Sequence, residues 1–136
     1  MPLPWTLERA NAALPYVRRI VADLVAAYAR WRETVNAFEV ASAGDTAAPS
    51  AEALRLQREA QALAREIDHF GSELAALGIQ CKSLEIGTVD FPAVLDDAPA
   101  YWCWTLGERD VAFWHTRDGG YASRRPVVES DATASG

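Results

Sequence analysis

The segment WCWTLGERDVAFWHT, residues 102–116, holds three of the five tryptophans together with one of two cysteines and one of two histidines. His115 lies near its end, Glu108 lies in its polar middle, and Asp90 precedes it in the segment VDFP. Imidazole accepts protons near neutral pH and binds transition metals, and carboxylates supply oxygen ligands. The three side chains therefore predict either the polar contacts of a binding site or the ligands of a transition metal in a metal-dependent enzyme.

An arginine pair and two tryptophans stand close to these groups in the sequence. Guanidinium groups bind carboxylates and phosphates, so Arg125 predicts a small anionic ligand. Trp104 and Trp114 would form a stacking wall beside it if they faced outward from a sheet that has helices on one side only. The plainer interpretation places both tryptophans in the core, Asp90 in a turn cap and Arg125 in an ion pair of the same domain.

A second candidate metal site lies in the helical half of the chain. Glu66 and His69 form the motif E-x-x-H, the ligand spacing of carboxylate di-iron four-helix proteins. One chain supplies one copy, so this site requires a homodimer that forms a four-helix bundle. Glu66 also belongs to a row of glutamates spaced seven apart, and the plainer role of such a row is pairing with arginines of the other helix. The row consists of Glu52, Glu59, Glu66 and Glu73.

Two long helices are the first elements that must position these groups. Apolar residues follow one another in alternating steps of three and four along both segments, which is the spacing of an amphipathic helix. The first row contains Leu7, Ala10, Leu14, Val17, Val21, Leu24, Tyr28, Trp31, Val35 and Phe38, and the second contains Ala53, Leu56, Ala60, Leu63, Ile67, Phe70, Leu74 and Leu77. The spacing predicts an antiparallel helical hairpin over 6–40 and 50–78, joined by a flexible linker over 41–49.

Four residues set the predicted ends of the helices. Thr6 and Ser50 are expected to cap the two amino-terminal ends, and Gly78 to end the second helix. Pro15 interrupts the first apolar row. Because a proline ring clashes with the preceding turn and lacks an N–H, we expect a short helix over 6–13 and a long one that starts with Pro15 in its first turn.

Beyond the second helix, the pattern changes to that of β-strands. The segment IQCKSLEI alternates and is ended by Gly87, and YWCWTL and VAFWHT flank the polar turn GERD as a β-hairpin. Pro92 and Pro99 predict a loop for VDFPAVLDDAPA. The region 79–126 is therefore expected to form a small three-stranded antiparallel sheet packed on the helical hairpin, followed by a flexible tail over 127–136.

The motifs of the chain also resemble those of a known family. The signature VDFP, CWxLGE, WH and RRP, with the opening WTLERANAALPYV, is similar to that of an uncharacterised bacterial domain-of-unknown-function family. The residues that match its pattern are Asp90, Phe91, Pro92, Cys103, Trp104, Gly107, Glu108, Trp114, His115, Gly120 and Arg125. Thr88, Phe113 and Tyr121 stand where leucine, tyrosine and phenylalanine are usual. The resemblance implies the predicted fold and a shared site, and it implies no particular reaction.

The composition limits the classes of partner. A net charge of −6 opposes binding to the phosphate backbone of nucleic acids. No apolar run approaches the roughly 18 residues of a membrane span, and no basic segment precedes an apolar one as in a secretory signal. We therefore expect a single cytoplasmic α+β domain over 1–136. Its expected role is that of a homodimeric module that binds a small anionic ligand or a protein partner, with the metal-dependent enzyme as the alternative.

Overall fold

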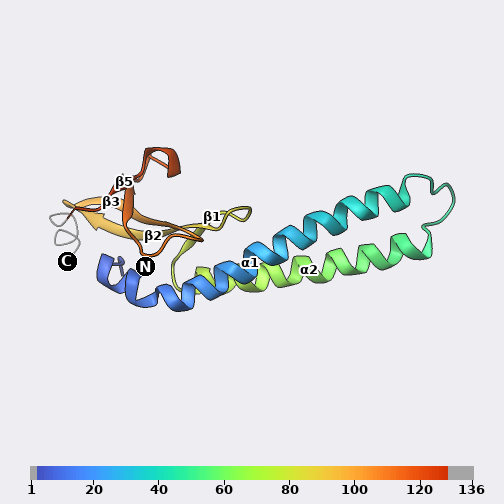
Figure 1. The fold of residues 1–136 in the computed structure, drawn as a ribbon, viewed down its shortest axis with the longest axis horizontal. Coiled ribbons are helices and arrows are strands. Elements are labelled where there is room, and N and C mark those ends of the chain that lie inside the picture. The colour runs from blue at the N-terminus through green and yellow to red at the C-terminus, as the bar shows by residue number, and fades with distance from the viewer. Residues whose placement is uncertain (1–2, 129–136) are drawn as a thin grey trace.

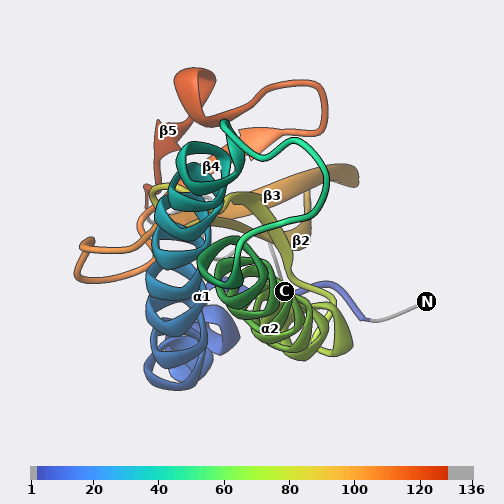
Figure 2. The same ribbon diagram turned by 90° about the vertical axis from the view of Figure 1, so that its right-hand side faces the viewer.

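The computed structural model describes residues 3–128 as two long helices followed by an antiparallel sheet (Figure 1). The helices are α1 (Leu7–Ser42) and α2 (Ala51–Ala76). The strands lie in the order β1 (Gln80–Ser83), β2 (Thr88–Leu95), β3 (Ala98–Thr105), β4 (Phe113–Thr116) and β5 (Arg125–Pro126), and a short 3₁₀ helix, η1 (Tyr121–Ser123), precedes β5. The sheet covers one half of the helical hairpin, and the other half extends beyond it (Figures 1 and 2). The chain is therefore an α+β protein, as predicted.

The predicted apolar rows lie on the less exposed sides of the two helices, because every member of both rows is buried or half-buried. The predicted caps are confirmed as well, because the side chains of Thr6 and Ser50 accept hydrogen bonds from the backbone N–H groups of Arg9 and Ala53, each at 3.1 Å. Gly78, which follows the C-cap residue Leu77 of α2, has a φ of 77°, the left-handed conformation that commonly ends a helix.

The predicted break at Pro15 is wrong. α1 continues through it, so the hairpin consists of two long helices and has no separate amino-terminal helix. A proline inside a helix costs about 3 kcal/mol. Two tertiary contacts offset this cost: the neighbouring Leu14 is buried in the core, and the Asn11 side chain pairs with the backbone of Val111. Asn11 Oδ1 accepts from Val111 N at 2.8 Å and its Nδ2 donates to the Val111 carbonyl at 3.1 Å.

The predicted loop over VDFPAVLDDAPA is also wrong, because this segment forms β2 and β3, and the sheet has five strands instead of three. The carbonyl of Pro92 accepts from Trp5 N at 2.7 Å, so the backbone groups of this proline point away from β3. On that side, β1 pairs with β2 only between Thr88 and Asp90, so no neighbouring strand lies beside Pro92. Pro92 therefore removes no ladder hydrogen bond. Asp96 and Asp97, with φ of 52° and 64°, form the tight turn between the two strands.

Two segments were expected to be flexible. In the linker, α1 continues to Ser42, and the side chain of Asp45 accepts from Ser50 N at 3.2 Å. In the tail, Val127 N donates to the Ala112 carbonyl at 2.8 Å, which attaches this residue to the sheet. Residues 129–136 of the predicted tail lie outside the described part of the chain.

The two faces of the sheet carry different side chains. Val89, Phe91 and Trp102 belong to the core that the sheet shares with the helices, and all three are fully buried. Because side chains alternate along a strand, the residues between them point to the opposite face. The buried polar residues on that face are Thr88, Asp90, Thr105 and His115, with the buried Cys103 among them. No helix within residues 3–128 has the length and apolar character needed to cross a membrane.

Candidate functional site

Three neighbouring strands bring Asp90, Cys103 and His115 together on the sheet face that points away from the helices. Asp90 of β2 lies directly opposite Cys103 of β3. His115 of β4 lies opposite Tyr101, the next residue of β3 on the same face as Cys103. One nitrogen, one sulfur and one carboxylate oxygen of this group all lie within 4.8 Å of one another. Strand register thus assembles three metal-ligating side chain types at one buried point.

The His115 ring has a defined orientation. Its Nδ1 lies 2.8 Å from the Thr116 carbonyl oxygen, and its Nε2 lies 3.0 Å from Oδ2 of Asp90. A carbonyl oxygen only accepts hydrogen bonds, so Nδ1 must carry a proton and donate it. In a neutral ring Nε2 is then an acceptor, and it faces Oδ2 of Asp90, which is also an acceptor. A proton or a cation must therefore lie between Nε2 and Oδ2.

The other two members of the group leave ligating capacity unused. Oδ1 of Asp90 has no hydrogen-bond partner among residues 3–128, although this side chain is only 2% exposed. Burial, and after it the charge of Asp90, raise the pKa of the Cys103 thiol to about 11, while Arg124 acts in the opposite direction. In the absence of a metal, Cys103 is therefore a protonated thiol at neutral pH and a poor nucleophile.

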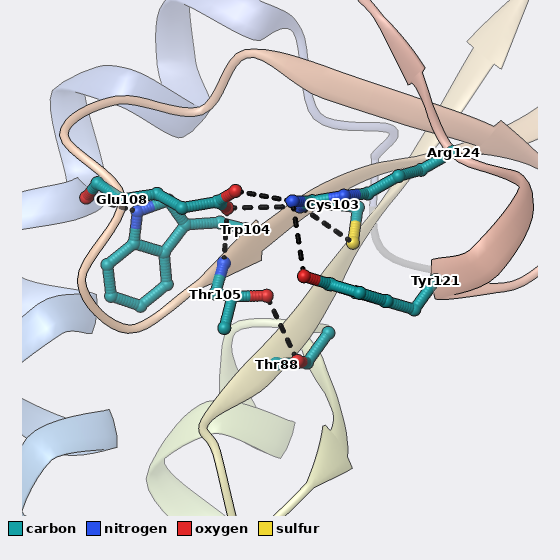
Figure 3. A network of polar contacts seen from close by, with 7 residues as sticks. All are labelled: Thr88, Cys103, Trp104, Thr105, Glu108, Tyr121 and Arg124. Carbon is teal, nitrogen blue, oxygen red and sulfur yellow. Dashed lines mark hydrogen bonds and ion pairs between the residues drawn. The ribbon is translucent and has the colours of Figure 1, made fainter.

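An ion pair borders this group on the sheet face (Figure 3). The Arg124 guanidinium donates to both carboxylate oxygens of Glu108, at 3.1 Å from Nη1 and 2.6 Å from Nη2. The same guanidinium lies 4.0 Å from the ring centroid of Phe113 and 4.3 Å from that of Tyr121, and its Nη1 is 3.9 Å from Sγ of Cys103. The hydrogen bond to Glu108 raises the pKa of Arg124, so the pair stays charged. Arg124 thus stands beside Cys103 as a fixed cation.

The turn after β3 fixes Glu108. Oε1 of Glu108 also accepts from Thr105 N at 2.8 Å, and its backbone carbonyl accepts from Trp104 Nε1 at 3.1 Å (Figure 3). Both carboxylate oxygens are therefore engaged by the protein itself. Glu108 acts as the partner that holds Arg124, and its position disfavours the predicted role as a metal ligand.

We expect Arg124→Ala to lower the free energy of unfolding by about 1.5–3 kcal/mol, the usual range for hydrogen bonds to a charged group. The matched control is Arg125→Ala, which removes an exposed guanidinium 5.3 Å from the Trp114 ring and should cost about 0.5–1 kcal/mol. Urea unfolding followed by tryptophan fluorescence measures both. Equal losses in the two variants would show that the pair with Glu108 contributes nothing particular.

The structure separates the predicted wall and anion site from the polar group. Trp104 is fully buried on the helix-facing side, where the Arg18 guanidinium lies 5.8 Å from its ring centroid. Trp114 is half-buried against the same core, and Arg125 of β5 lies beside it, on the face opposite His115. Both tryptophans thus follow the plainer interpretation, as parts of the core.

The helical pair Glu66 and His69 is exposed on α2. Nε2 of His69 lies 3.1 Å from Oε1 of Glu73, an ordinary surface pair one helical turn apart. Among the described residues, neither side chain belongs to a group of potential ligands. Within one chain, this motif forms no metal site.

Cys103 was not predicted as a member of the site, and of the arginine pair Arg124 and Arg125 only Arg125 was chosen. The position of Cys103 opposite Asp90 depends on a strand that was predicted as a loop. Arg124 stood beside the chosen Arg125, and only the backbone of this segment decides which of two neighbouring arginines points to which face. The cue that was available for Cys103 is its alternation with Trp102 and Trp104 in YWCWTL.

Comparison with known proteins gives one result. The model of a family described as an uncharacterized conserved protein (DUF2203) matches residues 4–127. The chain belongs to the DUF2203 family. No curated protein and no solved structure matches it. In this DUF2203 protein, all members of the polar group on the sheet lie inside the matched region.

Proposed function

We propose that the protein binds a divalent transition metal ion of the zinc class through Asp90, Cys103 and His115. The observation that carries the proposal is the pair of acceptors, Nε2 of His115 and Oδ2 of Asp90, which face each other at 3.0 Å. A metal cation would take the place of the proton between them. The hydrogen bond from Nδ1 to the Thr116 carbonyl supports this role, because metal-ligating histidines commonly donate their second N–H to a carbonyl group.

The donor set suits zinc in type and charge. Zinc binds imidazole nitrogen and carboxylate oxygen at about 2.0–2.2 Å and thiolate sulfur at about 2.3 Å, which places tetrahedral ligands roughly 3.5 Å apart. The three donors, which lie within 4.8 Å of one another, would need to move together only slightly. One thiolate and one carboxylate also neutralise a divalent ion, so the loaded site would bury no net charge.

Three protein ligands leave one coordination position for water or a small anion. We propose binding and assign no reaction, because the donors are buried and Glu108 is held by Arg124. In this proposal the predicted small anion would bind to the metal ion at its fourth coordination position, and it would not bind to Arg125. The proposal also favours the cytoplasm, where a single thiol such as Cys103 stays reduced.

The test is a titration of chelator-treated protein with Zn²⁺ and with Co²⁺, whose absorption reports a thiolate ligand directly. We expect one ion per chain, a rise in thermal stability on addition of Zn²⁺, and a sulfur-to-cobalt charge-transfer band that Cys103→Ser abolishes. Asp90→Asn should weaken binding by about tenfold or more. Affinity should also fall as the pH is lowered, because protons compete for the same ligand atoms.

Two matched controls accompany the titration. Cys81→Ser changes the second cysteine, which lies in β1 and packs toward the core, and His69→Ala removes the exposed histidine of α2. Both should leave the ion count and the cobalt spectrum unchanged. The proposal fails if the folded protein binds no ion, or if Asp90→Asn and Cys103→Ser bind as the unchanged chain does. The Asp90–His115 contact would then be a purely structural pair.

A further inference from the structure

The half of the hairpin that extends beyond the sheet exposes a continuation of the face on which the sheet packs (Figures 1 and 2). Where the sheet ends, Tyr28 and Trp31 of α1 line a groove with Ala64, Ile67 and Asp68 of α2, and Leu84 of the β1–β2 turn closes it. Asp68 is the one charged residue of this lining. Within the described chain, the sheet covers this face in one half of the hairpin and no strand covers it in the other (Figure 1).

Both helices present regularly spaced residues on this uncovered face. An α-helix has 3.6 residues per turn. The positions that continue the sheet-facing side of each helix into the uncovered half are therefore 28, 32, 35 and 39 on α1, and 57, 60 and 64 on α2. They are occupied by Tyr28, Arg32, Val35 and Glu39 on α1 and by Gln57, Ala60 and Ala64 on α2, all of them exposed or half-buried. Each row follows steps of three and four, the spacing of a helix–helix seam. We name these seven residues the distal face.

We propose that the distal face packs against the distal face of a second copy of this chain, so that the two hairpins form an antiparallel four-helix bundle. The inference goes beyond the metal site and does not depend on it. The sheet dictates the direction, because it occupies one half of the same face. A second copy can approach only with its own sheet at the opposite end, which sets α1 antiparallel to α1 and α2 antiparallel to α2.

The charges on α1 complement each other in this arrangement. Arg32 and Glu39 lie on either side of Val35, at equivalent helical positions and with opposite signs. An antiparallel copy centred near Val35 places each copy's Arg32 opposite the other copy's Glu39, and the twofold axis makes the contact twice. Among residues 3–128, Arg32 pairs with Glu85 at 3.1 Å, with both side chains more than half exposed, and its guanidinium lies 5.9 Å from the Tyr28 ring centroid. Such a pair is weak and leaves Arg32 able to change partner.

The shapes of the two rows also fit. The row on α2 contains two alanines, so two copies of α2 can approach closely. The midpoint of that row is Ala60, and because Tyr28 and Ala64 line the same groove, Ala60 lies close to the level of Val35 on the antiparallel α1. One twofold axis can therefore serve both rows.

Glu66 of the E-x-x-H motif lines the groove on the other side of the hairpin, so this dimer would not assemble the di-iron site.

Light scattering after size exclusion, over a series of protein concentrations, tests the inference. The unchanged chain should have the mass of a dimer, and Arg32→Glu and Glu39→Arg should each weaken dimerisation by about tenfold or more, because like charges then face each other. The double variant R32E/E39R should restore the dimer. Restoration is specific to antiparallel self-pairing, since it cannot follow from a general loss of folding.

Arg30→Glu is the matched control, because it makes the same charge change on the opposite side of the hairpin. It should leave the dimer intact, and Val35→Glu should produce a folded monomer. A monomeric unchanged chain at every concentration overturns the inference, as does a dimer that Val35→Glu leaves unaffected or a double variant no better than the single ones. Metal content is expected to be the same in all these variants, so failure here is separable from failure of the zinc site.

Discussion

Replacing His115 by alanine is expected to lower the free energy of unfolding by about 3–5 kcal/mol, which places it among the most harmful single substitutions in this chain. The imidazole is only 4% exposed and is the hydrogen-bond partner of Asp90. Its removal would leave a buried carboxylate whose Oδ1 has no hydrogen-bond partner among the described residues and whose remaining polar neighbour is the Cys103 thiol. An unpaired buried charge costs far more than an exposed histidine contributes, and urea unfolding of the metal-free protein measures the difference.

Two variants separate the charge from the loss of packing. His69→Ala removes an exposed histidine and should change stability by less than about 0.5 kcal/mol. Asp90→Asn keeps the shape of the side chain, and its amide N–H can donate to Nε2 of a neutral His115 ring, so it should cost only about 1 kcal/mol. When Asp90→Asn is already present, His115→Ala should then cost clearly less than in the unchanged chain. Equal costs with and without Asp90→Asn would show that the Asp90 carboxylate adds nothing to the cost of removing His115.

Asp90→Asn also separates folding from metal binding. The variant retains a hydrogen bond to His115 and therefore the sheet, but an amide is a much weaker zinc ligand than a carboxylate. A folded Asp90→Asn protein that binds metal at least about tenfold more weakly supports both the pair and the metal site. A folded variant that binds metal as tightly as the unchanged chain places the ion somewhere else.

The helical half of the fold was predictable because its information is local. Steps of three and four identify one face of a helix wherever the helix lies, and every residue of both predicted rows is at least half-buried. The caps at Thr6 and Ser50 were predictable for the same reason, since a capping side chain bonds to the backbone three residues on. Nothing outside the segment is needed for such inferences.

The two errors in the fold have one physical cause. Pro15 and Pro92 were each interpreted as a break because a proline removes one backbone donor. The cost of that loss depends on what stands opposite the missing N–H, and the sequence does not show it. At Pro92 no neighbouring strand lies opposite the missing N–H, and at Pro15 the contacts of Leu14 and Asn11 hold the helix in place.

Only part of the candidate site could be predicted from the sequence. Asp90 and His115 were expected in one site because their residue types invite chemistry, and the structure brings them to 3.0 Å. Cys103 could not be placed there without the register of β2, which was predicted as a loop. Arg125 was preferred over Arg124, but the choice between the two depends on the path of residues 117–125 across the sheet. Binding of an ion by the site stays a prediction until the titration is done.

Substitution of Gly87 by alanine is the other change with a large expected effect, a loss of about 2–4 kcal/mol. Gly87 ends the β1–β2 turn with a φ of 80°, which an L-residue with a side chain adopts only at a cost. A Cβ at this position would lie 2.9 Å from Cβ of Leu106 and 2.9 Å from Cγ1 of Val21. Cβ of Leu106 is the first atom of its side chain, so it cannot move aside without its backbone.

The cost arises because the sheet and α1 meet at this glycine. Gly87 N donates to the Ser83 carbonyl at 2.9 Å and its own carbonyl accepts from Leu106 N at 2.9 Å, so the backbone cannot shift without breaking a hydrogen bond. The control is Gly71→Ala inside α2, where no described atom beyond the adjoining residues and backbone of the helix itself lies within 4 Å of the new Cβ. There alanine should raise stability by about 0.5–1 kcal/mol. Thermal and urea unfolding should therefore give opposite signs for the same chemical change, and a harmless Gly87→Ala would show that the sheet does not approach α1 as closely as described.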